Sequence, residues 1–155
     1  MLHDETLISS FEDFVSDAAP RLQDALGAMF GTDAGRDATA EALAHGWEHW
    51  DRVMEMDNRI GYLFVVGRDR ARKTRTSRQV VLTPLDTVRA PWVEPGLPAA
   101  LAALPRQQRT VVMLLHSFDW TMSEVAEVMG VSKGTVQSYE KRAMSRLRRK
   151  LGAPG

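Results

Sequence analysis

The residues whose types and spacing could do chemistry lie between Met122 and Tyr139, and the chemistry they suit is DNA recognition. A helix-turn-helix needs a small residue where its helices cross and, at the turn, a residue that tolerates a left-handed backbone. Ala126 and, four residues later, Gly130 meet these needs, and Ser132 can cap the second helix. Apolar residues that would fill the space between the helices are Val125, Met129, Val131, Val136 and Tyr139. An amphipathic hairpin without a DNA role shares this pattern, but the adjoining positive charge favours DNA.

The second helix of this motif is predicted to run from about Lys133 to Leu151. Its early outward side chains could reach base edges in a major groove, and later cations could bind phosphates, which position the protein without specifying sequence. For Thr135 and Ser138 the sequence leaves both roles open. The predicted DNA-binding residues of this helix are Lys133, Thr135, Gln137, Ser138, Lys141, Arg142 and Arg146.

Charge is segregated along the chain, although the formal net charge is zero. Residues 1–60 carry 13 acidic and 4 basic side chains, residues 61–78 carry 6 basic and 1 acidic, and residues 132–155 carry 7 basic and 1 acidic. Two basic islands on an otherwise acidic chain indicate two places that meet a polyanion. The alternative is two solvated charged surfaces with no ligand.

Helical spacing of apolar residues predicts three helices in the N-terminal half, at about 7–30, 37–54 and 60–75. Pro20 is expected to kink the first helix or to mark a helix boundary. Two residues could cap the second helix, Thr32 and Asp33.

Residues 76–97 contain three prolines and no sustained apolar period, which predicts an interdomain linker. Its apolar residues Val80, Val81, Leu82 and Trp92 could dock on a neighbouring surface. Helices are expected after it at 98–104 and 106–117, followed by the helix-turn-helix.

The expected fold is therefore all-α, with two small helical domains joined by an extended linker. The predicted domains are residues 1–76 and 98–155, with the linker at 77–97. Halves of this size have small cores, and the sequence leaves open whether the two halves pack together.

Several classes of protein are disfavoured by what the sequence lacks. There is no cysteine, hence no disulfide and no thiolate metal site. The N-terminus shows no signal peptide, and the apolar stretches are too short to span a bilayer, so a cytoplasmic location without membrane contact is expected. There is no P-loop or dinucleotide-binding motif and no distinctive acid–base pair, so we expect no catalytic residue and no cofactor.

Histidine and aromatic residues near the middle of the chain are further candidates for a binding site. His45 and His49 lie one helical turn apart, but Glu48 occupies the wrong position for a zinc-protease motif and no third ligand is evident, so no metal is expected. Trp47 and Trp50 are expected in the core, because they share a helical stripe with Leu43 and Met54. The pair Tyr62 and Phe64, beside the first basic island, could contact melted DNA or pack in the core.

The C-terminal half resembles region 4 of the sigma-70 family. Leu101-Ala-Ala-Leu-Pro-Arg-Gln-Gln-Arg109 matches the family pattern L-x-x-L-P-x-x-x-R, and Gly130-Val-Ser-Lys-Gly-Thr-Val-Gln-Ser138 matches G-V-S-x-G-T-V-x-S. The N-terminal half is similar to region 2 of the extracytoplasmic-function group. The segments that carry this second likeness are 11–14, 37–50 and 57–63.

The resemblance implies a specificity subunit of RNA polymerase, not itself an enzyme, that binds core polymerase and promoter DNA. An anti-sigma protein is a further partner by resemblance. Region 2 of the family grips core polymerase and melts the promoter, while region 4 reads an upstream element. The resemblance places core-polymerase binding at Asp37, Ala40 and Glu41. It places promoter melting at Tyr62, Arg68, Asp69, Arg70, Arg72 and Lys73.

The chain departs from the family pattern at three places. Ala40 stands where the clamp-binding motif D-x-x-Q-E has glutamine. In place of R-x-A-R-N, the third helix has Val65 in the arginine position and Asp69 in the asparagine position. The recognition helix keeps Arg142 but lacks other family cations. These departures motivate a second interpretation, a DNA-binding regulator that has lost polymerase function. A third is a protein-binding module whose acidic half sequesters a basic partner.

Overall fold

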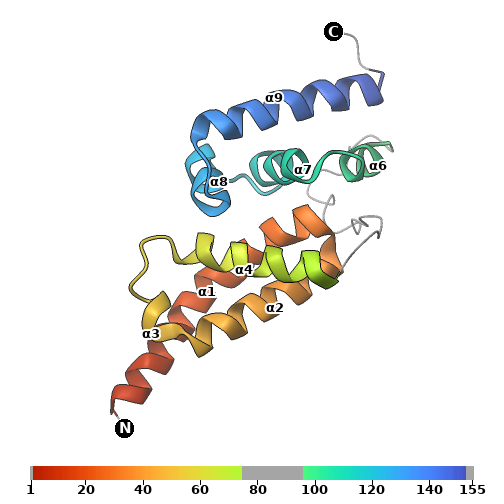
Figure 1. Ribbon diagram of the computed structural model, residues 1–155. Coiled ribbons are helices and arrows are strands. Elements are labelled where there is room, and N and C mark those ends of the chain that lie inside the picture. The colour runs from red at the N-terminus through yellow and green to blue at the C-terminus, as the bar shows by residue number, and fades with distance from the viewer. Residues whose placement is uncertain (1, 75–95, 153–155) are drawn as a thin grey trace.

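The computed structural model describes residues 2–74 and 96–152, and every secondary-structure element within them is helical. The N-terminal half comprises α1 (Leu2–Phe30), α2 (Thr32–Glu48), the short α3 (Trp50–Val53) and α4 (Arg59–Thr74). The C-terminal half comprises α6 (Leu97–Ala102), α7 (Arg106–Val112), the π-helical turn η1 (Met113–Ser117), α8 (Met122–Met129) and α9 (Lys133–Lys150). Figure 1 shows the second group lying across α1 and α4, with α9 on the outer side.

The first helix, α1, continues without interruption through Pro20, so a helix boundary at that residue was a wrong prediction. Pro20 is exposed, whereas Ala18 and Leu22 on either side are fully buried. Packing along the buried face of α1 therefore outweighs the one backbone hydrogen bond that the proline ring removes.

The connection from α1 to α2 is a single residue, Gly31, whose φ of 98° suits glycine. The chain reverses so tightly that a Cβ on Gly35 would lie 2.4 Å from the Cα of Gly27. Helix α2 consequently begins at Thr32, five residues earlier than expected. Gly31 is its N-cap and no side chain caps it, so neither Thr32 nor Asp33 has the predicted role. The helix also ends earlier, at Glu48, and the predicted continuation to Met54 is interrupted at His49 before α3.

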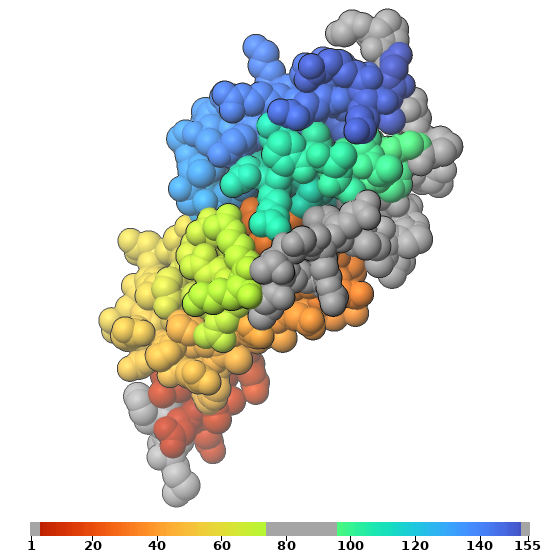
Figure 2. All heavy atoms as spheres, turned by 45° about the vertical axis from the view of Figure 1, so that its right-hand side comes forward, coloured from red at the N-terminus to blue at the C-terminus, as the bar shows by residue number. Residues whose placement is uncertain are grey.

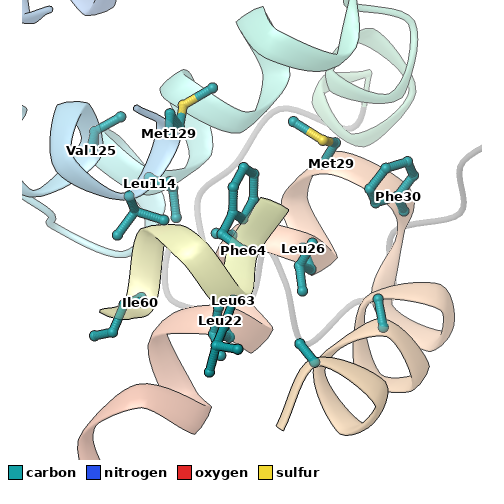
Figure 3. Close-up of a cluster of buried hydrophobic side chains, with 14 of the residues drawn as sticks. Leu22, Leu26, Met29, Phe30, Ile60, Leu63, Phe64, Leu114, Val125 and Met129 are labelled. Carbon is teal, nitrogen blue, oxygen red and sulfur yellow. The ribbon is translucent and has the colours of Figure 1, made fainter. Parts of the chain in front are cut away.

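One hydrophobic core joins the two halves, which settles a point that the sequence left open. Its buried residues come from α1, α2 and α4 in the N-terminal half and from α7, η1, α8 and α9 in the C-terminal half. Phe64 is 1% exposed, and Figure 3 shows it projecting from α4 between Leu114 and Met129 on one side and Leu26 and Met29 on the other. Phe64 is thus a core residue and is not placed to contact melted DNA.

The predicted linker lies almost wholly in residues 75–95, outside the described residues, as do Val80, Val81, Leu82 and Trp92. Its last two positions are described: Gly96 is a turn residue and Leu97 begins α6. Across 2–74 and 96–152, none of the helices combines the length and the apolar character that crossing a bilayer requires.

Candidate nucleic-acid interface

The start of α8, the first helix of the helix-turn-helix, is fixed by a capping box between Thr121 and Glu124. The Thr121 hydroxyl accepts a hydrogen bond from the Glu124 backbone N–H at 3.1 Å, and the Glu124 carboxylate accepts one from the Thr121 N–H at 2.8 Å. The hydrogen bond from the Thr121 backbone to the carboxylate, and then one from the Thr121 side chain, lower the pKa of Glu124. Sequence reasoning missed this cap, although Thr-x-x-Glu ahead of an apolar run is its usual signature.

The turn between α8 and α9 has the geometry that the sequence predicted. Gly130 adopts a left-handed conformation with φ of 68°, and the Val131 N–H donates to the Ala126 carbonyl at 3.0 Å. Ser132 caps α9 by accepting a hydrogen bond from the Thr135 N–H at 3.1 Å. Ala126 is buried where the hairpin packs, in the company of Val125, Met129 and Val136. The two helices are thereby held as one rigid unit.

Six of the seven DNA-binding residues predicted on α9 have exposed side chains: Lys133, Gln137, Ser138, Lys141, Arg142 and Arg146. The seventh, Thr135, is half-buried, and its hydroxyl lies 3.0 Å from that of Ser132 within the N-cap. Its contribution to the cap explains why a threonine stands at this position. It leaves Thr135 less available than the others to a base or a phosphate.

The cations of α9 divide between two sides of the helix. At 100° per residue, Gln137, Lys141 and Arg148 follow one side, and Arg146 and Lys150 follow the other. Arg146, Arg149 and Lys150 line a hollow of about 380 Å³. Its other lining residues are Ala100, Ala103 and Leu104. The structure therefore places Arg146 beside α6, apart from the residues nearest the turn.

The first basic island lies on α4, and its members differ in environment. Asp69, Arg70, Arg72 and Lys73 are exposed, whereas Arg68 is half-buried. The carboxylate of Asp69 lies 3.6 Å from Arg68, and Arg70 lies 3.9 Å from Glu41 of α2. The negative charge of Asp69 is thus partly offset by its neighbour.

Tyr62 is half-buried on α4, and its hydroxyl lies 2.8 Å from Nε2 of His45 on α2. Burial, followed by the neighbouring His49, lowers the pKa of His45, which favours the neutral ring. His45 thus has Tyr62 as its hydrogen-bond partner, and its ring lies 4.4 Å from the His49 ring.

The residues predicted to bind core polymerase, Asp37, Ala40 and Glu41, are all exposed on α2. Their spacing of three and four residues puts them on one side of the helix. Further along α2, the prediction for Trp47 was wrong: it is 46% exposed, although its ring packs 5.2 Å from that of Phe11. Trp50, by contrast, is buried as predicted, because the break at His49 turns it inward.

Two residues that join the halves were not singled out from the sequence. Arg109 is 1% exposed and donates to the carbonyl oxygens of Ala28 and Met29 at the end of α1 and of Ala102 and Leu104 near the end of α6. Burial lowers its pKa to about 10, which leaves it charged at neutral pH. The sequence feature that could have singled it out is its position as the arginine of the motif L-x-x-L-P-x-x-x-R.

The other joining residue is Asn58, whose side-chain oxygen accepts a hydrogen bond from the Gly61 N–H at the start of α4. Its amide nitrogen donates to the carbonyl of Glu127 in the last turn of α8 at 2.5 Å. One side chain therefore ties the start of α4 to the helix-turn-helix. No spacing rule in the sequence links residues so far apart.

Comparison with known proteins agrees with this geometry. Residues 100–149 match the family model described as Sigma-70, region 4. The chain is 31% identical over 127 residues to the RNA polymerase sigma-E factor of Streptomyces coelicolor, a match that covers 76% of the chain and 72% of that protein. It is 28% identical over 125 residues to the sigma-E factor of Streptomyces antibioticus, covering 75% of the chain and 69% of that protein.

Two solved structures share the fold. One is the sigma factor RpoE in complex with the anti-sigma factor NepR from Bartonella quintana, with a TM-score of 0.64, 21% identity, and coverage of 94% of this chain and 99% of that one. The other is CnrH in complex with the cytosolic domain of CnrY, with a TM-score of 0.63, 22% identity, and coverage of 95% and 90%. With an all-α fold in two halves and a region 4 helix-turn-helix, the chain belongs to the sigma-70 family of RNA polymerase sigma factors, in its extracytoplasmic-function group.

Proposed function

We propose that this sigma factor directs promoter-specific initiation by a division of labour between its two halves. The exposed side of α2 that carries Asp37, Ala40 and Glu41 binds core RNA polymerase. The basic island of α4 contacts the promoter where it melts, and the N-terminal part of α9 reads an upstream element. The factor acts in the cytoplasm with the polymerase and carries no catalytic residue of its own.

The observation that carries this proposal is the geometry of the helix-turn-helix. A left-handed Gly130 and the Ser132 cap present the start of α9 as a rigid, solvent-facing end. Lys133, Gln137 and Lys141 stand exposed there, with donors and acceptors of the kinds that read base edges in a major groove. The cations farther along α9 supply the salt-dependent attraction to phosphate that positions such a helix.

The two departures in region 2 set the strength of initiation. Ala40 is exposed and apolar where the family has an amide, so α2 makes fewer hydrogen bonds to the polymerase. Asp69 is exposed beside the basic residues of α4, and its charge opposes an approaching phosphate. Replacing Ala40 with Gln and Asp69 with Asn is therefore expected to raise transcription from a cognate promoter. No rise from the double variant would contradict this assignment of roles.

An anti-sigma protein is proposed as a second partner. The support is that the structurally similar RpoE was solved with the anti-sigma factor NepR, and that CnrH was likewise solved with a partner, the cytosolic domain of CnrY. The match between this chain and those two structures covers 94% and 95% of the chain, so it shares their fold over nearly its whole length.

The experiment that tests the function is co-elution of the full chain with purified core polymerase on a sizing column at moderate salt. Co-elution that is lost in an Asp37→Lys, Glu41→Lys variant is expected. The matched control is Asp13→Lys, Asp17→Lys, two exposed acidic residues of α1. Failure of the unaltered chain to co-elute at micromolar concentration, with DNA binding intact, would instead favour the stand-alone regulator.

A further inference from the structure

We propose that His45 of α2 is a positioning residue for promoter melting, a role that rests on the function proposed above for α4. Through one hydrogen bond, His45 holds Tyr62 of α4 in the orientation in which the tyrosine ring meets DNA. Helices α2 and α4 lie side by side, as Figure 1 shows. In Figure 2 the yellow-green atoms of α4 are open at the surface beside the orange atoms of α2.

Tyr62 stands in the middle of the exposed side of α4. Asp69 and Lys73 follow it along the helix, and at 100° per residue both lie within about 20° of Tyr62 around the helix axis. Both of these residues are exposed, whereas Phe64 and Ala71, on the opposite side of the helix, are 1% and 5% exposed. Tyr62 is therefore the aromatic residue of α4 that shares a side with the exposed members of the basic island.

The hydroxyl group of Tyr62 is directed at α2. It lies 2.8 Å from Nε2 of His45, and the centroids of the two rings are 5.8 Å apart. A tyrosine hydroxyl can donate or accept, and in both cases this bond keeps it directed at the histidine. The part of the tyrosine that remains for DNA is the ring, which can stack on an unpaired base of any type.

A second contact between α2 and the exposed side of α4 is weaker. Arg70 lies 3.9 Å from Glu41, and their side chains are 46% and 48% exposed. Exposed ion pairs contribute little and are screened by salt. The bond between His45 and Tyr62 is shorter and part-buried, so it is the better suited of the two to select one side-chain orientation.

The environment of His45 holds the histidine itself in place. Its side chain is half-buried, and its ring lies 4.4 Å from that of His49, one turn further along α2. A tyrosine without this anchored partner can adopt other staggered orientations, and it loses that freedom only when it binds DNA. Removing the bond is therefore expected to slow melting although the ring is still present.

The test measures promoter opening by the full chain assembled with core polymerase. The DNA is a promoter that the unaltered holoenzyme selects from a random-sequence library, with a fluorescent adenine analogue in the segment that melts. His45→Leu and Tyr62→Phe are each expected to slow opening roughly threefold to tenfold. The double variant is expected to be no slower than either one, because all three lack the same bond. Losses that multiply in the double variant would overturn the proposal.

Two further variants separate positioning from other effects. His45→Gln is expected to open the promoter almost as fast as the unaltered chain, because its amide can bond the tyrosine hydroxyl. The matched control His49→Leu removes the neighbouring ring and leaves the bond in place, so its effect is expected to be below about twofold. A glutamine variant as slow as His45→Leu, or equal slowing by His49→Leu, would contradict the proposal. Slow opening by Tyr62→Phe with normal opening by His45→Leu would instead assign the hydroxyl to direct DNA contact and overturn it.

Tyr62→Leu distinguishes a failure of this positioning role from a failure of the function proposed for α4. Removing the ring is expected to slow opening about tenfold or more. Slow opening by Tyr62→Leu with normal opening by His45→Leu would overturn the positioning role alone. Normal opening by Tyr62→Leu would overturn the role of α4 in melting and, with it, that of His45.

Co-elution with core polymerase is the control for the position of His45 on α2, four residues after Glu41. All the variants, once shown to be folded by circular dichroism, are expected to co-elute like the unaltered chain. Loss of co-elution in His45→Leu would assign its effect to the polymerase surface and overturn the proposal.

The free chain provides a readout that involves neither DNA nor polymerase. Its two tyrosines are Tyr62 and Tyr139, so selective labelling of tyrosine rings gives two sets of NMR signals. His45→Leu is expected to shift the Tyr62 signals and His45→Gln to return them toward their original positions, while the Tyr139 signals stay in place. Tyr62 signals that do not move in His45→Leu would show that the bond does not hold the ring, and would overturn the proposal.

Discussion

Arg109 of α7 donates a hydrogen bond through Nε to the carbonyl oxygen of Ala28 in α1, at a distance of 2.7 Å. The bond joins the two halves of the sigma factor deep inside the molecule, where the guanidinium is 1% exposed. The carbonyls that Arg109 contacts lie at or near the C-terminal ends of α1 and α6, which carry the negative end of each helix dipole. Among residues 2–74 and 96–152 no carboxylate pairs with this buried cation, so carbonyl groups at the helix ends stabilise it.

Replacing Arg109 with methionine is expected to lower the free energy of unfolding by about 3 kcal/mol, because carbonyl groups of both halves lose their donor while buried. Urea denaturation followed by circular dichroism measures the change. The matched control is Arg148→Met on the exposed side of α9, with an expected effect below about 0.5 kcal/mol. Equal stability of the two variants would show that the contacts of Arg109 contribute little.

Gly130 and Gly134 form a second matched pair, because they differ in backbone conformation and not in crowding. Gly130→Ala places a Cβ on a residue with φ of 68° and is expected to lower the free energy of unfolding by about 1 kcal/mol. Gly134→Ala lies inside α9, where the nearest atom to the added Cβ is the Ser132 hydroxyl at 3.7 Å. It is expected to raise stability by roughly 0.5 to 1 kcal/mol. Thermal unfolding of both variants measures these changes. If both variants gained stability or both lost it, the prediction would be contradicted.

Substitutions in α9 are expected to separate base reading from phosphate binding. Gln137→Ala is predicted to change which promoter sequences are preferred, because an amide can pair with a base edge. Arg146→Ala is predicted to weaken binding to every sequence and to reduce its dependence on salt. Anisotropy titrations on matched and scrambled duplexes over a range of salt concentrations measure both effects.

The control for this pair is Arg36→Ala, an exposed arginine outside both basic islands, which is expected to leave DNA affinity unchanged. Uniform loss on all duplexes from both Gln137→Ala and Arg146→Ala would remove the distinction between the two roles.

The capping box makes the stability of the folded protein depend on pH in a defined direction. The pKa of Glu124 is lowered, first by the hydrogen bond from the Thr121 backbone and then by that with its side chain. A carboxyl whose folded-state pKa lies below its unfolded value contributes stability above the unfolded pKa, and loses it as pH falls through the folded one. The extra stability of the unaltered chain over Glu124→Gln is therefore expected to be complete at pH 6 and to shrink below about pH 4.

Glutamine can still accept the hydrogen bond from the Thr121 N–H, so this variant removes the charge and keeps the cap. Urea denaturation of both proteins between pH 3 and pH 7 makes the comparison. A difference that stays constant over this range would assign the contribution of Glu124 to its shape and not to its ionisation.

The sequence by itself determined the parts of this protein that rest on local rules. The left-handed turn at Gly130, the Ser132 cap and the buried residues between α8 and α9 follow from short-range spacing, and the structure confirms them. The all-α fold class was also predictable, because amphipathic helices repeat their apolar residues at three and four positions. Helical spacing within a single segment also explains why the exposed cations of α9 could be predicted from the sequence.

Tertiary structure decided what depends on contacts between distant segments. Pro20 remains inside α1 because buried neighbours on both sides pack against other helices, and Trp50 is buried in α3 after the chain breaks at His49, while Trp47 in α2 stays exposed. The shared core around Phe64 and the bonds from Arg109 to α1 join residues that no periodicity relates. Such contacts form only when the whole chain is packed, since burial of apolar surface is a property of the assembled core and not of any single segment.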